Sequence, residues 1–133
     1  MENQFLRTEM VLGADGMDAL RRSHVAVFGL GGVGSWCAEA LARAGIGALT
    51  LVDEDTVSES NINRQCCALH STIGLPKAEV MAARVRDINP GIAVDARALA
   101  DALEAEEKAG WEVAEAAYDG TDFVVTFERE GAL

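Results

Sequence analysis

Residues 24–34 read His-Val-Ala-Val-Phe-Gly-Leu-Gly-Gly-Val-Gly, an apolar run followed by a glycine-rich turn. The apolar run lacks the alternation of a half-exposed strand, which predicts a strand covered on both faces, as in a parallel sheet. Gly29, Gly31 and Gly34 fit the pattern G-x-G-x-x-G, in which glycines allow a tight turn, a close approach to phosphate and close helix packing. The N-terminus of a following helix favours an anion there. This stretch therefore predicts a nucleotide site.

Strands and helices alternate along the rest of the sequence. The expected strands are residues 24–28, 48–52, 92–95 and 122–125, and the expected helices are residues 15–22, 33–44, 76–88 and 98–109. This alternation predicts an α/β fold: a Rossmann-like, doubly wound, mainly parallel sheet with helices on both faces. We divide the chain into an N-terminal arm and helix (1–23), a nucleotide-binding domain (24–125) and a divergent tail (126–133).

The composition is that of a soluble globular domain, with 133 residues, 50% hydrophobic side chains and a net charge of -11. The acidic excess is concentrated after residue 97, so the segments around the glycine turn remain open to an anionic ligand. The uncharged stretch 25–38 is too short and too glycine-rich for a membrane span. Three cysteines without framework spacing favour a reducing, cytoplasmic location.

Three charged residues beyond the turn indicate which nucleotide binds. Asp53 ends the second expected strand, 19 residues after Gly34, where a carboxylate can accept hydrogen bonds from ribose hydroxyls. Arg64 and Lys77 follow, and two cations beside a phosphate-binding turn suit a triphosphate better than the pyrophosphate of NAD. An NAD-dependent oxidoreductase remains an alternative, as does the possibility that Arg64 and Lys77 are solvated surface charges.

Several motifs in a fixed order resemble the ThiF/MoeB/HesA family, the bacterial relatives of ubiquitin-activating enzymes. They are Gly29-Leu-Gly-Gly-Val-Gly-Ser35, Leu51-Val-Asp-Glu-Asp55, Ser60-Asn-Ile-Asn-Arg-Gln65, Gly74-Leu-Pro-Lys77 and Ile88-Asn-Pro90. The resemblance covers about residues 4–95. Within the family, residues 34–43, 46–47 and 61–65 are more similar to the branch that dehydrates threonylcarbamoyladenosine in tRNA than to the branch that adenylates sulfur carriers.

The resemblance implies roles for individual residues. The residues that match the family's ATP-binding positions are Gly29, Gly31, Gly32, Gly34, Asp53, Asp55, Asn61, Asn63, Arg64 and Lys77. Asp53 would hold the ribose, and Arg64 and Lys77 would contact the phosphates and act in catalysis. Arg7 matches an arginine that reaches the ATP of a partner subunit, which implies a third catalytic residue and a homodimer.

The resemblance also implies a reaction. A carboxylate attacks the α-phosphate of ATP, pyrophosphate leaves, and in the tRNA branch ring closure on threonylcarbamoyladenosine then expels AMP. In the sulfur-carrier branch, the carboxylate belongs to the C-terminal glycine of a ubiquitin-like carrier protein. Such enzymes chiefly position the reactants and stabilise charge. A nucleotide-binding module without catalysis remains a third alternative.

The similarity breaks at the end of the sequence. The family has an Asp-x-x-Asp pair after its next strand, and the second Asp helps to hold Mg²⁺, whereas this chain has Thr126-Phe-Glu-Arg129. We therefore expect ATP with Mg²⁺ as the family's cofactors, but no metal ligand assigned in this chain. The abrupt break after Val125 leads us to expect a truncated or frame-shifted form of a longer enzyme.

Overall fold

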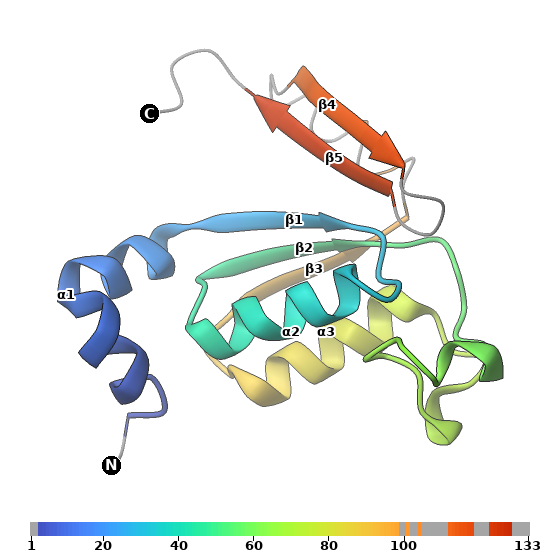
Figure 1. Cartoon of the computed structure of the whole chain (residues 1–133), viewed down its shortest axis with the longest axis horizontal. Helices are drawn as coiled ribbons and strands as arrows, with labels where there is room; N and C mark the ends of the chain where they lie inside the picture. The colour runs from blue at the N-terminus through green and yellow to red at the C-terminus, as the bar shows by residue number, and fades with distance from the viewer. Residues whose placement is uncertain (1–2, 99–100, 102–103, 105–111, 119–122, 129–133) are drawn as a thin grey trace.

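The computed structural model describes residues 3–98, 101, 104, 112–118 and 123–128, and for the last two ranges it gives the backbone only. Most of the expected helix 98–109 lies outside these residues, as do residues 129–133 of the expected tail. The described elements form a three-stranded sheet, a separate two-stranded sheet and three α-helices (Figure 1).

The central sheet consists of β1 (His24–Phe28), β2 (Ala48–Val52) and β3 (Ala93–Arg97), all parallel and in the order β1-β2-β3. The helices α2 (Gly34–Ala44) and α3 (Lys77–Ile88) connect successive strands. Because both connections move in the same direction across the sheet and such crossovers are right-handed, both helices cover one face (Figure 1). The expected Rossmann-like parallel fold is confirmed; helices on both faces are not seen among the described residues.

The core lies between the sheet and these two helices. Its buried side chains include Val27, Leu49, Leu51, Ala38, Ala42, Met81 and Val85. The small alanines of α2 and α3 let both helices approach the strands closely, and the β-branched and leucine side chains of the sheet fill the space between them. This packing fixes the carboxyl ends of the three strands relative to the start of α2.

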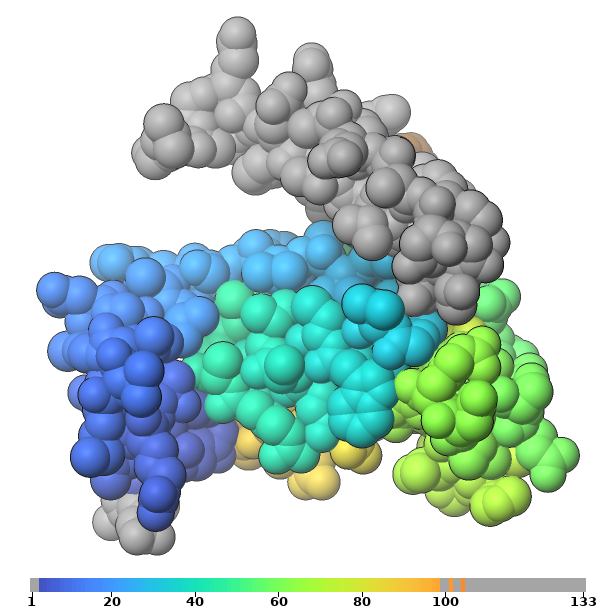
Figure 2. All heavy atoms as spheres, in the orientation of Figure 1, coloured from blue at the N-terminus to red at the C-terminus, as the bar shows by residue number. Residues whose placement is uncertain are grey.

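The N-terminal segment differs from the expectation. An arm to Gly13 and a helix from residue 15 were predicted, but α1 spans Leu6–Arg22 with a kink at Gly13, where φ is +73°. The prediction was wrong because a glycine within a helical segment was read as its boundary, whereas glycine can adopt this left-handed conformation inside a kink. α1 lies at the amino end of the sheet, next to the start of β1 (Figure 1 and Figure 2).

The last described strands also differ from the expectation. Residues 122–125 were predicted as a fourth strand in a series of parallel units, but β5 (Phe123–Glu128) pairs antiparallel with β4 (Glu112–Tyr118) in a separate sheet. β4 was not predicted, and β5 continues three residues into the expected tail. The short apolar run indicated a strand correctly but carried no information on its partner. No helix in the described ranges is long and apolar enough to cross a membrane.

Candidate nucleotide-binding site

The glycine-rich turn lies at the carboxyl end of β1, directly before α2. Gly29 has a φ of +85°, which suits glycine, and its N–H donates to the carbonyl of Val52 at 2.8 Å. A Cβ on Gly34 would lie 1.8 Å from the carbonyl oxygen of Gly29, so only glycine permits this approach of helix and turn. The turn therefore has the backbone geometry that the sequence motif predicts for binding a phosphate.

Asp53 follows β2 and faces the glycine turn. Its Oδ2 accepts a hydrogen bond from the N–H of Leu30 at 2.6 Å, and its Oδ1 accepts one from the N–H of Asp55 at 2.8 Å. These two bonds fix the carboxylate beside the turn, while each oxygen keeps a lone pair for another donor. Asp53 is partly buried, so a ribose at this position would lie at the edge of the sheet.

Arg64 also lies against the glycine turn, at Gly32. Its Cγ and Cδ are 3.5 Å from the position that a Cβ on Gly32 would occupy. The guanidinium Nη1 donates to the carbonyl of Ser60 at 3.3 Å and to Oδ1 of Asn63 at 3.0 Å. Arg64 is exposed, as the surface-charge alternative expects, but its contact with Gly32 places its side chain against the predicted phosphate site.

Asn61 shapes the loop that carries Arg64. Its Oδ1 accepts a hydrogen bond from the N–H of Ser58 at 2.9 Å, within the 3-10 turn Glu59–Asn61. Its side-chain oxygen is therefore already engaged within the loop, whereas Asn63 orients the guanidinium of Arg64 directly. The expectation that both asparagines contact the nucleotide remains a prediction.

Lys77 is the first residue of α3 and is buried, with its side chain 6% exposed. Its Nζ lies 3.4 Å from Oδ2 of Asp55, whose side chain is 76% exposed. The alternative that Lys77 is a solvated surface charge is therefore wrong. A buried ammonium at a helix N-terminus is unfavourable without a counter-charge, as expected of a group that binds an anion.

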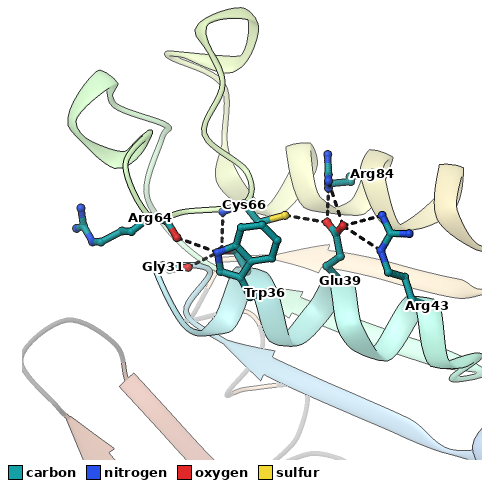
Figure 3. Close-up of polar contacts among 8 residues, drawn as sticks. Gly31, Trp36, Glu39, Arg43, Arg64, Cys66 and Arg84 are labelled. Atoms are coloured by element: carbon teal, nitrogen blue, oxygen red, sulfur yellow. Dashed lines mark hydrogen bonds and ion pairs between the residues drawn. The ribbon is translucent and has the colours of Figure 1, made fainter.

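A polar network that the sequence did not predict joins α2 to the glycine turn and to the loop that carries Arg64 (Figure 3). The hydroxyl of Ser35 donates to the carbonyl of Gly31 at 2.5 Å and accepts from the N–H of Cys66 at 3.0 Å. The indole Nε1 of Trp36 donates to the carbonyl of Arg64 at 2.9 Å. The first turn of α2 is thus bonded both to the glycine turn and to the loop that carries Arg64.

Glu39 is the centre of this network, one turn further along α2. Its buried carboxylate accepts hydrogen bonds from the guanidinium groups of Arg84 and Arg43 and from the thiol of Cys66. The spacing of Glu39 and Arg43 on one helix could have indicated their pair. Arg84 comes from α3, and the sequence contains no signal for its contact with Glu39.

The network shifts the pKa values of its members. The guanidinium of Arg84, with smaller contributions from Cys66 and Arg43, lowers the pKa of Glu39 from 4.5 to about 2, although burial opposes the shift. Burial, reinforced by the Glu39 carboxylate, raises the pKa of Cys66 to about 11. Burial also raises the pKa of Cys67, against the effect of the Lys77 charge. Glu39 is therefore a charged structural group, and both thiols remain protonated near neutral pH.

Arg7 is the one predicted site residue that the structure places far from the others. It lies in α1 at the amino end of the sheet, whereas the glycine turn, Asp53 and Lys77 lie at the carboxyl end (Figure 1). Within one chain it cannot act at this site. Among the described residues, moreover, no group of three or more His, Cys, Asp or Glu side chains could hold a metal ion.

The chain resembles characterised proteins over this region. It is 54% identical over 90 residues to the tRNA threonylcarbamoyladenosine dehydratase of Bacillus subtilis, covering 68% of this chain and 35% of that protein. It is 48% identical over 80 residues to the molybdopterin-synthase adenylyltransferase of Escherichia coli, covering 60% and 32%. The chain thus spans about a third of the length of these relatives.

A solved structure is similar as well. The Escherichia coli tRNA N6-threonylcarbamoyladenosine dehydratase TcdA in complex with ATP matches with a TM-score of 0.69 and 51% identity, over 69% of this chain and 38% of that chain. The ThiF family model matches residues 4–127, which extends beyond the region of expected resemblance and includes β4 and all but the last residue of β5. The chain belongs to the ThiF family.

Proposed function

We propose that this chain forms the nucleotide-binding part of an ATP-dependent enzyme that dehydrates threonylcarbamoyladenosine in tRNA. The observation that carries the proposal is that Asp53 contacts the glycine turn at Leu30 and Arg64 contacts it at Gly32, with Lys77 buried at the start of α3. The identity of 54% to a tRNA threonylcarbamoyladenosine dehydratase supports this substrate. Free cysteines, two of them buried, fit a reducing cytoplasm.

The chain's own residues would bind and orient ATP. The free lone pairs of the Asp53 carboxylate accept the ribose hydroxyls, and the N–H groups at the start of α2 face the phosphates. Arg64 and Lys77 stabilise the charge that develops as pyrophosphate leaves. The bond between Trp36 and Arg64 keeps Arg64 in position before ATP arrives.

The reaction then needs few further groups. A carboxylate oxygen of the threonylcarbamoyl group attacks the α-phosphorus of ATP, and the bond to the β-phosphate oxygen breaks. An internal nucleophile of the same group closes a ring on the activated carboxyl carbon and expels AMP. The substrate loses one water in total, and its oxygen atom leaves with AMP. Arg64 and Lys77 act by charge stabilisation, and neither exchanges a proton.

Arg7 supports a homodimeric arrangement in this proposal. Its side chain has no hydrogen bond or ion pair among the described residues, and Met10 and Val11, about one turn further along α1, are 79% and 83% exposed. A second copy of the chain would cover these apolar side chains and receive Arg7 at its ATP site. Light scattering after size exclusion tests the dimer. Mixing an Arg7→Ala variant with a Lys77→Ala variant tests the shared site, since activity would partly recover in mixed dimers.

The described residues do not form a complete Mg²⁺ site of their own. They contain no cluster of three or more ligands, so the phosphates of ATP and water would supply most of the oxygen ligands of a Mg²⁺ ion. We assign no reaction step to the metal.

A second candidate is the activation of a sulfur-carrier protein. The 48% identity to a molybdopterin-synthase adenylyltransferase favours it, because the glycine turn, Asp53, Arg64 and Lys77 suit adenylation of any carboxylate. A module that binds nucleotide without catalysis is the third candidate.

Pyrophosphate exchange distinguishes the three candidates. The protein is incubated with ATP and labelled pyrophosphate, either with tRNA that carries threonylcarbamoyladenosine or with a ubiquitin-like carrier protein. Exchange that depends on the modified tRNA supports the leading proposal, and exchange that depends on the carrier supports the second. Binding of ATP without exchange under either condition supports the third, and preferential binding of NAD contradicts all of them.

A further inference from the structure

The ion pair between Lys77 and Asp55 joins a buried group to an exposed one. The Lys77 ammonium has its side chain 6% exposed, and its one charged partner among the described residues is the Asp55 carboxylate, which is 76% exposed. The separation of 3.4 Å is long for a charge-assisted hydrogen bond, which usually measures about 2.7–2.9 Å. The partner of this buried cation is therefore held loosely and is open to solvent.

Backbone contacts fix Asp55 independently of its carboxylate. Its N–H donates to Oδ1 of Asp53 at 2.8 Å, and its carbonyl accepts from the N–H of Lys77 at 3.0 Å. The side chain can therefore turn away from Lys77 without disrupting the loop. A replacement that keeps the backbone, such as asparagine, should leave these bonds in place.

The electrostatics allow one anion at a time beside Lys77. A buried ammonium needs a counter-charge, which Asp55 supplies in the absence of ligand. A phosphate group that approaches Lys77 meets the repulsion of the Asp55 carboxylate and must compete with it for the same cation. The carboxylate therefore stabilises the ligand-free state at the expense of the phosphate-bound state.

We propose that Asp55 is an exchangeable counter-ion of Lys77 that a nucleotide phosphate displaces, so that Asp55 weakens the binding of phosphorylated nucleotides relative to adenosine. This inference rests on the proposed role of Lys77 in binding ATP. It changes the expected role of Asp55, which the family resemblance places among the residues that bind the nucleotide favourably.

Calorimetric titration of the wild type and of Asp55→Asn with ATP and with adenosine, both without Mg²⁺, tests the proposal. Asp55→Asn is expected to bind ATP about fivefold more tightly, the ratio that corresponds to about 1 kcal/mol for a partly exposed ion pair. Its affinity for adenosine is expected to stay the same. Glu54→Gln is the matched control: it removes the same charge from the exposed neighbouring side chain, and its affinity for ATP should stay within about twofold of the wild type.

Thermal unfolding gives a second measurement. It can be made on Asp55→Asn or, if that variant is poorly soluble, on Asp55→Ser. The ligand-free variant should melt at a lower temperature because Lys77 has lost its counter-charge, and the stabilisation by ATP should be larger than for the wild type. A lower melting temperature without a gain in ATP affinity would mean a purely structural role and would overturn the proposal. A loss of ATP affinity confined to solutions with Mg²⁺ would also overturn it, since Asp55 would then be a metal ligand.

These outcomes separate the inference from the proposed function. If the wild type binds ATP and Asp55→Asn shows no gain, the inference fails alone. If Asp55→Asn shows the gain but no carboxylate substrate supports pyrophosphate exchange, the proposed enzyme activity fails and the counter-ion role stands. If the wild type does not bind ATP, both fail.

Discussion

The indole Nε1 of Trp36 donates a hydrogen bond to the backbone carbonyl of Arg64 at 2.9 Å, which joins the first turn of α2 to a loop 28 residues further along the chain. The Trp36 side chain is 53% exposed, so packing in the core does not account for its position. Arg64 in turn lies against Gly32 of the glycine turn. A solvent-exposed tryptophan thus orients a cation that we propose to contact ATP.

Replacing this donor should weaken ATP binding without unfolding the protein. Trp36→Phe keeps an aromatic ring but removes the N–H, and the loss of one hydrogen bond of about 0.5–1.5 kcal/mol corresponds to a decrease of about two- to tenfold in ATP affinity. Titration calorimetry measures the affinity, and circular dichroism checks the fold. Cys37→Ala, at the next and also exposed position of α2, is the control and should leave the affinity unchanged. Equal affinity of Trp36→Phe and the wild type would remove Trp36 from the site.

Two alanine substitutions in the glycine turn should have opposite outcomes. Gly34→Ala places a Cβ 1.8 Å from the carbonyl oxygen of Gly29, and relief of this clash requires movement of α2 or of the turn. We expect a loss of more than about 3 kcal/mol in the free energy of unfolding, measured by urea denaturation. Gly32→Ala meets only the Arg64 side chain at 3.5 Å, so the fold should persist. Similar stability of the two variants would contradict the close approach at Gly34.

The parts of the site that the sequence predicted are those with local signals. The turn around Gly29 and Gly34 is recognisable because a strand, a spaced set of glycines and a helix occur in succession, and the position of Asp53 follows from the parallel register of β1 and β2. Gly45 ends α2 in the left-handed conformation, with a φ of +97°, as its place after the apolar helix indicates.

The parts that were missed depend on contacts between distant segments. Glu39 and Arg84 are 45 positions apart and on different helices, so no periodicity relates them. The antiparallel partner of β5 likewise depends on tertiary structure, which local propensities do not contain. The indole N–H of Trp36 donates to a backbone carbonyl. Every residue has such a carbonyl, so residue types alone cannot predict this contact.

The three cysteines should differ strongly in reactivity. Cys37 is exposed, whereas Cys66 and Cys67 are buried and their thiol pKa values are raised. Because the thiolate is the reactive form, iodoacetamide at about pH 8 should label Cys37 in the native protein and leave the other two unmodified. Mass spectrometry of the digested protein identifies the labelled sites, and all three should react in denaturant. Rapid labelling of Cys66 under native conditions would show that its contact with Glu39 does not form.

The hydrogen bonds of Glu39 should make the free energy of unfolding depend on pH in the acid range. The pKa of Glu39 in the folded chain is about 2, compared with 4.5 for the free side chain, so the unfolded state binds the proton more readily than the folded state. The stabilisation is therefore complete above about pH 5 and decreases as the pH falls from about 4.5 towards 2. A shift of this size on a buried carboxylate corresponds to about 3 kcal/mol.

Urea denaturation of the wild type and of Glu39→Gln across about pH 2.5–7 measures this contribution. The variant keeps the side-chain volume but leaves the partly exposed Arg84 without its counter-charge, so its free energy of unfolding should be lower by about 3 kcal/mol at neutral pH. The difference from the wild type should shrink through the acid range, because protonation removes the same charge from the wild type. Glu79→Gln, on the exposed side of α3, loses a carboxylate outside the polar network of Glu39 and should follow the wild-type curve. A difference between the wild type and Glu39→Gln that stays constant from about pH 7 to 3 would mean that the ionisation of Glu39 is not the source of the stabilisation.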